Sequence, residues 1–178
     1  MSVHISSGGE KQTTVFRSQI SKADPVVENP TPGLMVVAVL RRTFADAVTF
    51  YFQALGFHWN VKGSDFAQYH ALFKEIYEDT YESIDPIAEN ILKMNGIAPF
   101  RLPELVALRS ISDQLVRSMM PADMVVALYA SNSQYLTTLN MAFEICVAAN
   151  EQGIANFIAE RIDVHQRFAW QLKASITV

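Results

Sequence analysis

Two histidines in one short segment are the residues of this chain best suited to hold a metal ion. His58 and His70 stand on either side of a polar turn in "GFHWNVKGSDFAQYHALF", in a chain that has four histidines in all. Neutral imidazole is a common ligand of transition metals. If both flanks are helical, a rise of ~1.5 Å per residue places both rings roughly 6 to 11 Å from the turn. The alternative is a pair of core histidines with satisfied hydrogen bonds.

Two carboxylates further along could complete such a site, but not within one chain. Asp85 and Glu89, in "ESIDPIAEN", are spaced i,i+4 and share one helix face. Asp85 follows His70 by fifteen residues, or ~22 Å along a helix, whereas the ligands of one ion lie within a few ångströms of each other. Carboxylates from a second copy, packed antiparallel about a two-fold axis, would give two identical sites per dimer. The alternative is a solvated acidic face.

The elements that must position these residues are four long helices. Apolar residues recur every three or four positions over about 34–61, from Phe66 to "MNG" at 94–96, over about 122–149 and over about 153–175. Gly63 can supply the left-handed residue that closes the first helix, and Asp65 with Gln68 fits a capping box for the second. No alternation typical of strands competes with this pattern.

The connection between the second and third helices is unusually long. It exceeds 20 residues, contains three prolines and has room for a short helix near 103–110, whereas helices in compact bundles are joined by about 2 to 8 residues. A connection of this length crosses the bundle, which is the ferritin-like form of the all-α four-helix bundle. The start of the second helix and the ends of the first and fourth then share one end.

Composition predicts one soluble domain at residues 33–178, preceded by a flexible N-terminal arm at 1–32. The chain has 178 residues and a formal charge of −4, with 14 basic and 18 acidic side chains, so no basic field favours nucleic acid. The arm's three basic and three acidic residues cancel. A single cysteine, Cys146, and no signal-like or membrane-spanning run favour a cytoplasmic location.

The motifs resemble those of the Dps family, small ferritin-like proteins. "HWNVKG", then F-x-x-x-H, then D-x-I-A-E carry the resemblance. It implies a dodecameric cage, built from two-fold dimers, that oxidises ferrous iron with hydrogen peroxide or dioxygen and stores ferric iron. It also implies that His58 and His70 come from one subunit and Asp85 and Glu89 from its dimer mate. Imidazole and carboxylate suit ferrous iron and also accept zinc.

The chain departs from the family pattern one turn after His70. Lys74 stands where the family has an aspartate, which puts a second iron position in doubt unless the lysine points away or is neutralised. His165 lies on or beside the apolar stripe of the last helix, and we hypothesise that it replaces the aspartate in a three-histidine centre that binds zinc more tightly. The alternative is that His165 is not a metal ligand, because the segment "RIDVH" also resembles the last helix of Dps proteins that keep the aspartate. Pro86 should kink the second helix.

Two other functions stay open. One is a DNA-shielding structural protein, for which the neutral arm predicts weak binding at physiological salt. The other is a helical oligomer with core histidines and no metal. A conventional ferritin site within one bundle is not expected, because the chain has no Glu-x-x-His motif.

Overall fold

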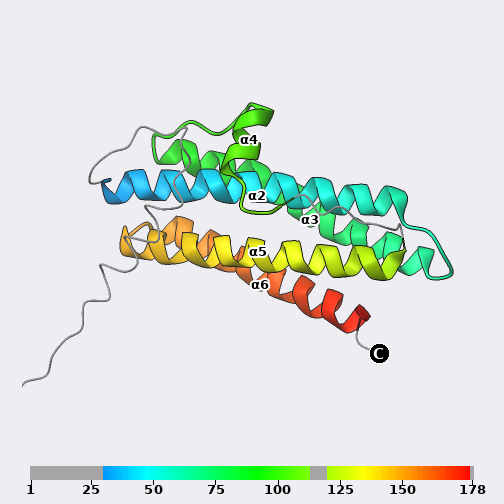
Figure 1. Ribbon diagram of the computed structural model, residues 1–178. Helices are drawn as coiled ribbons and strands as arrows, with labels where there is room; N and C mark the ends of the chain where they lie inside the picture. Colours follow the sequence, from blue (N-terminus) through cyan, green and yellow to red (C-terminus); the bar gives the residue numbers. More distant parts are fainter. Residues whose placement is uncertain (1–29, 113–119, 177–178) are drawn as a thin grey trace, which may run out of the picture.

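The protein is an antiparallel helical bundle with a long crossover (Figure 1). This computed structural model describes residues 30–112 and 120–176, and within them it contains five helices and no strand. The helices are α2 (Pro32–Asn60), α3 (Phe66–Lys93), α4 (Leu102–Leu108), α5 (Pro121–Ala148) and α6 (Gln152–Ile176). The four long helices and the short one agree with the predicted ranges to within about two residues at each end, the usual uncertainty of helix termini. The all-α ferritin-like fold is therefore confirmed.

The helix ends show which local interactions fix the boundaries. Pro32 is the first residue of α2, where its missing N–H costs nothing, and the backbone N–H of Leu34 donates to Thr31 Oγ1 at 3.4 Å. The predicted capping box is wrong, because the Asp65 side chain accepts no bond from the first turn of α3 and instead accepts one from Ser64 Oγ at 3.2 Å. Gly63 has a φ of 114° but lies beyond Val61, the residue that caps α2.

The "MNG" segment ends α3 as predicted, through a left-handed asparagine. Asn95 has a φ of 58°, its N–H donates to Leu92 O at 2.9 Å, and the N–H of Gly96 donates to Ile91 O at 2.9 Å. This is the Schellman arrangement, which satisfies carbonyls that the helix end would otherwise leave free. A Cβ at position 96 would lie 2.7 Å from Val37 Cγ1, so glycine is needed there for packing.

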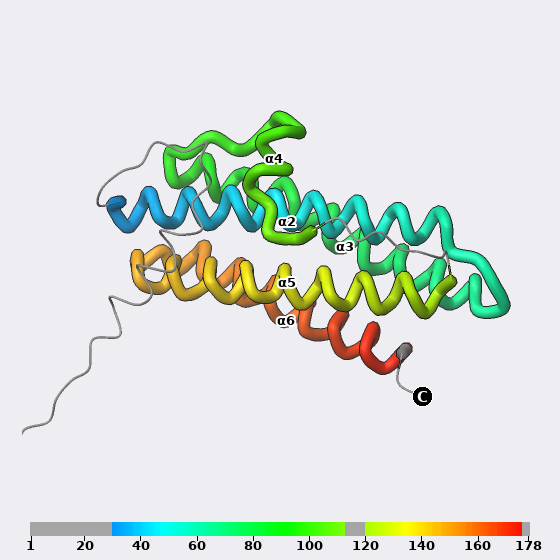
Figure 2. The backbone as a smooth tube through the Cα atoms, viewed as in Figure 1, coloured from blue at the N-terminus to red at the C-terminus, as the bar shows by residue number. Residues whose placement is uncertain are grey.

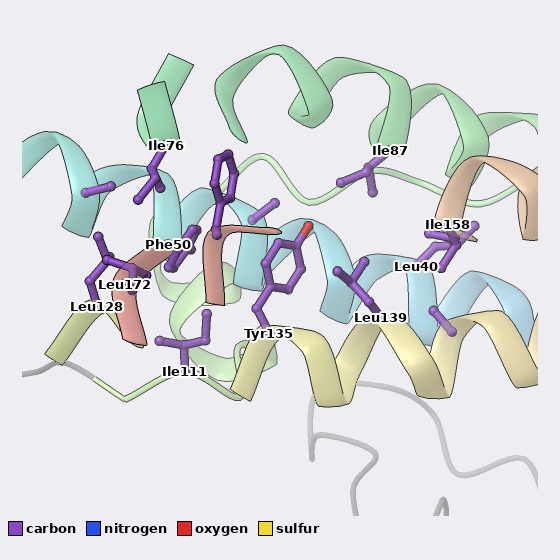
Figure 3. Close-up of a cluster of buried hydrophobic side chains, with 14 of the residues drawn as sticks. Leu40, Phe50, Ile76, Ile87, Ile111, Leu128, Tyr135, Leu139, Ile158 and Leu172 are labelled. Atoms are coloured by element: carbon purple, nitrogen blue, oxygen red, sulfur yellow. The ribbon is translucent and has the colours of Figure 1, made fainter. Parts of the chain in front are cut away.

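One continuous apolar core joins the four long helices (Figure 3). Large buried side chains come from every long helix and from the crossover: Leu40, Phe50, Ile76, Ile87, Ile111, Leu128, Tyr135, Leu139, Ile158 and Leu172. Helix α2 packs on both α3 and α5, and α5 packs on α6. Burial of these side chains, at roughly 1.5–3 kcal/mol each, is the main force that holds the bundle together.

The crossover is fastened to the bundle by a buried carboxylate. Asp46 of α2 is fully buried and accepts hydrogen bonds from Ser110 N at 2.6 Å, Ser110 Oγ at 2.7 Å, Ile111 N at 3.1 Å and Thr138 Oγ1 at 2.7 Å. Four donors compensate the cost of burying the charge. Helix α4 is held on α2 by the pair between Arg41 and Glu104, 2.5 Å apart, and the tube in Figure 2 shows it lying over α2.

The helix ends that were predicted to lie together share one end of the bundle. The turn between α2 and α3, the start of α5 and the end of α6 lie at the same end of the bundle (Figure 1). This is the arrangement that the long crossover predicted. None of the described helices is long and apolar enough to cross a lipid bilayer.

Candidate metal centre

The two histidines of the turn form a stacked pair. His58, in the last turns of α2, and His70, in the second turn of α3, have ring centroids 3.6 Å apart and planes inclined by 22°. Each ring bonds the backbone of the other, because His58 Nδ1 lies 2.8 Å from His70 O and His70 Nδ1 lies 2.8 Å from His58 O. The predicted meeting of the two residues across the antiparallel helices is confirmed.

These reciprocal bonds decide which ring nitrogens are free. A carbonyl oxygen can only accept, so each Nδ1 carries the hydrogen and donates it. In a neutral imidazole the lone pair is then on Nε2. Ligating histidines in metal sites are oriented in the same way, with the second nitrogen donating to a carbonyl or carboxylate. The pair therefore offers two pre-oriented Nε2 ligands.

Two aromatic rings fix the pair from either side. Phe66 stacks on His70 with centroids 4.8 Å apart, and Tyr77 meets His58 edge-on at 5.1 Å. Both histidines are half-buried, so their Nε2 atoms remain within reach of a partner. Sequence reasoning missed Tyr77 as a neighbour of the site, although its spacing of seven residues from His70 puts it on the same helix face.

Lys74 is neutralised within its own helix. It forms an ion pair with Glu78, one turn further on, and its Nζ lies 5.7 Å from the centroid of the Tyr77 ring. The lysine is exposed. Glu75 pairs instead with Arg167 of α6.

The carboxylates of α3 lie apart from the histidines of their own chain. Asp85 and Glu89 are exposed, and neither side chain bonds another described residue. They follow His70 by roughly four to five turns, so the helix itself keeps them ~22 Å or more away. In the described part of the chain no group of three or more His, Cys, Asp or Glu residues is placed to hold a metal. A single chain thus carries the two predicted halves at opposite ends of α3.

His165 lies in the bundle core, and among the described residues it forms no metal-ligating group with the histidine pair, so its part in the centre stays a prediction. His165 is fully buried, and its Nδ1 lies 2.7 Å from Asn132 Oδ1, while Asn132 Nδ2 donates to His165 O at 2.8 Å. Phe50 and Tyr135 surround the ring, with centroids 5.4 and 4.6 Å away. The apolar stripe correctly predicted that this side chain faces inward.

Lys74 lies on the outer face of α3, whereas the His165 side chain is enclosed in the core. Burial, and secondly the nearby Arg161 guanidinium, lower the pKa of His165 well below its usual range. The ring is therefore a neutral part of the bundle core. Pro86 lies inside α3 without ending it, and the helix continues to Lys93.

Comparison with known proteins agrees with this architecture. The ferritin-like domain family matches residues 37–178. DNA protection during starvation protein 2 of Bacillus anthracis is 27% identical over 139 residues, which cover 78% of this chain and 94% of that protein.

Two solved structures show the same fold. Dps from Thermosynechococcus elongatus has a TM-score of 0.74 at 24% identity, over 93% of this chain and 95% of that one. The Dps protein of Vibrio cholerae O1, described as a member of a broad superfamily of ferritin-like diiron-carboxylate proteins, has a TM-score of 0.78 at 22% identity, over 86% and 100% of the two chains.

These similarities support a mini-ferritin role in iron storage, with iron as the metal that the protein handles. The matched region includes the stacked histidines, both carboxylates and the crossover. The chain belongs to the ferritin-like family and, within it, to the Dps proteins.

Proposed function

We propose that this protein is a cytoplasmic ferroxidase that oxidises ferrous iron at centres shared between two subunits and stores the ferric product in a dodecameric cage. Each centre would combine His58 and His70 of one subunit with Asp85 and Glu89 of the partner subunit. Iron is the substrate and cargo, and zinc can compete for the same ligands. The observation that carries the proposal is the pair of reciprocal Nδ1 bonds between two stacked rings, which leaves a lone pair on the Nε2 of each ring.

The distribution of charge along α3 supports a shared centre. Of its six acidic residues, the first three pair within the chain, Glu75 with Arg167, Glu78 with Lys74 and Asp79 with Arg161. The later acids, Asp85 and Glu89 among them, bond no other described side chain. Carboxylates left unpaired at this end of the helix are available to a cation bound by another subunit.

The outer face of α2 and α3 supports an antiparallel dimer. Phe52 and Tyr81 are 64% and 61% exposed there, and large exposed apolar side chains mark interaction surfaces. A two-fold axis that crosses α3 near Glu78 would lie midway between His70 and the two carboxylates. It would place His70 opposite the helix turn of the partner subunit that carries the second pair of carboxylates. The same axis generates two identical centres.

Mixed oligomers test whether the centre is shared. The variants His58→Ala with His70→Ala, and Asp85→Ala with Glu89→Ala, should each lose ferrous oxidation. When the two variants are co-assembled in equal amounts, half the dimers are mixed and each has one intact centre, so about a quarter of the wild-type activity should return. If all four residues act within one chain, the mixture stays inactive.

Anaerobic ferrous titration, followed by separate addition of peroxide and dioxygen, tests the reaction itself. Absorbance of the ferric product is the readout, and Asp163→Ala, an exposed acid of α6, is the control that should match wild type. No oxidation of bound iron by either oxidant would refute the enzyme proposal. Under that outcome DNA shielding without ferroxidase activity becomes the leading function.

A further inference from the structure

Three of the six tyrosines form a row of ring contacts that begins at the histidine pair. Tyr77 meets His58 with ring centroids 5.1 Å apart, Tyr77 and Tyr51 are 6.4 Å apart, and Tyr51 and Tyr81 are 5.4 Å apart. All three separations fall within the range of aromatic contacts. We call Tyr77, Tyr51 and Tyr81 the tyrosine row.

The row follows from helix spacing on the seam between α2 and α3. Tyr77 and Tyr81 are four residues apart on α3, and Tyr51 is seven residues before His58 on α2, so all lie along one outer face. The phenol hydroxyls of the row bond no other described residue. By contrast, the Tyr69 hydroxyl donates to Ser175 O at 3.3 Å, and Tyr135 is buried in the core. Among the described tyrosines, the row runs from the histidine pair to Tyr81, which is 61% exposed in the single chain.

The charges around the pair favour one cation per centre. Lys74 follows His70 by one turn and offers no carboxylate to a second ion beside the imidazoles. Glu78, one turn further on, is already paired with this lysine. A single ferrous ion can supply one electron, whereas reduction of peroxide to water takes two. The centre therefore needs another electron donor close by.

Building on the proposed ferroxidase, we propose that the tyrosine row supplies the second electron to peroxide. The ferrous ion and the Tyr77 phenol each lose one electron, the peroxide O–O bond breaks, and the phenol proton with one solvent proton completes two water molecules. The products are a ferric ion and a neutral tyrosyl radical, which exchanges an electron and a proton with Tyr51 and Tyr81. A later ferrous ion, with one proton from water, reduces the radical back to the phenol. The sum is two ferrous ions oxidised per peroxide, without release of hydroxyl radical.

Rapid freeze-quench EPR tests the row directly. The oligomer is loaded anaerobically with one ferrous ion per centre and mixed with one equivalent of peroxide. Wild type should give a tyrosyl radical that ring-deuterated tyrosine narrows, which separates it from a radical on the neighbouring Trp59. Tyr77→Phe keeps the ring contact and removes the phenol, so the signal should be lost. Tyr129→Phe, a tyrosine of α5 outside the row, should leave the signal unchanged.

Spin trapping of hydroxyl radical gives a second readout that a structural defect would not imitate. Trapped radical should be absent from wild type and should rise in Tyr77→Phe and in the triple Phe variant of the row, with ferrous binding measured alongside. An unchanged EPR signal in the triple variant overturns the inference. So does complete iron oxidation in wild type with no tyrosyl radical, an outcome that leaves the ferroxidase standing. Failure of wild type to bind ferrous iron at all would instead remove the proposed function, and the inference with it.

Discussion

His165 shows how one buried residue can set the acid stability of the bundle. Its Nδ1–H donates to Asn132 Oδ1, so the lone pair is on Nε2, which finds no partner among the described residues. Protonation would place a positive charge among Phe50, Tyr135 and Phe168. Burial is the main reason why the pKa of this ring lies well below its ordinary value of 6.5.

We predict that this histidine makes stability fall below about pH 6.5. In the unfolded chain the ring takes up a proton near its ordinary pKa of 6.5, whereas in the folded protein it stays neutral to lower pH. The unfolded state then binds more protons, so the free energy of unfolding decreases as pH falls through this window. His165→Gln keeps a donor for Asn132 and removes the titration. Urea midpoints at about pH 7.5 and about pH 5.5 should differ less in this variant than in wild type, and parallel pH profiles would contradict the assignment.

Cys146 should be chemically silent in the folded protein. It is fully buried in α5, and burial, followed by the charge of Glu151, raises the pKa of the thiol to about 11. Because the thiolate is the reactive form, iodoacetamide at about pH 8 should leave the folded protein unmodified and alkylate it after denaturation. Ser133→Cys, an exposed position of the same helix, provides the reactive control. Alkylation of Cys146 as fast as that control would show that α5 opens locally.

At the scale of elements, the crossover depends on the carboxylate of Asp46. Replacing it with Asn leaves one acceptor oxygen for donors from Ser110, Ile111 and Thr138, and turns an amide NH₂ toward them. Since a buried donor left unsatisfied costs about 1–3 kcal/mol, Asp46→Asn should lower the free energy of unfolding by about 3 kcal/mol or more. Urea unfolding gives the value. Asp163→Asn, an exposed acid of α6, should change it by less than about 0.5 kcal/mol, and a similarly small loss in Asp46→Asn would mean that the crossover is held by α4 instead.

Hydrophobic period and loop length were enough to predict the helices and their order. The i,i+3/i+4 pattern marks each long helix because all four bury one face in the same core. A connection of more than 20 residues between the second and third helices favours a crossover topology over a bundle with short loops. Local caps were less predictable. Asp65 has the right type and spacing for a capping box, but it has a φ of −98° and a ψ of 17°, outside the extended region typical of a side-chain cap.

The candidate site was predictable where contacts follow from local spacing and not where they depend on the depth of packing. His58 and His70 meet because a short turn sets their register. The apolar pattern of α6 correctly predicted that His165 faces inward. It does not show which residues of α2 and α5 surround the ring. The tyrosine row also escaped sequence reasoning, since Tyr51 and Tyr77 are joined only by the pairing of two helices.

At the scale of the whole molecule, the two proposed half-sites lie apart within one chain, and no complete metal site is found among its described residues. The distance along α3 that separates His70 from Asp85 is fixed by helix geometry, so no movement of side chains can close it. Assembly is therefore part of the proposed chemistry. The same outer face would bring the tyrosine row near the two-fold axis, where exposed Tyr81 lies.

The charge of the assembled protein predicts weak association with DNA. Each chain contributes a formal charge of −4, and the arm at 1–32 has no net charge, with Lys11, Arg17 and Lys22 balanced by Glu10, Asp24 and Glu28. Non-specific affinity comes mainly from cations that neutralise phosphates and release counterions. We therefore expect no gel shift of duplex DNA at about 150 mM salt.

A matched variant shows whether the arm's charge is the cause. Replacing Glu10, Asp24 and Glu28 by Lys changes the formal charge of the arm from zero to +6, and twelve such arms would surround a dodecamer if the proposed cage forms. This variant should shift DNA strongly at low salt and lose affinity steeply as salt rises, because each neutralised phosphate adds about 0.9 to the slope of log affinity against log salt. Tight, salt-resistant binding by wild type would contradict the prediction. It would indicate that contacts other than charge hold the DNA, and that shielding is a second activity of the cage.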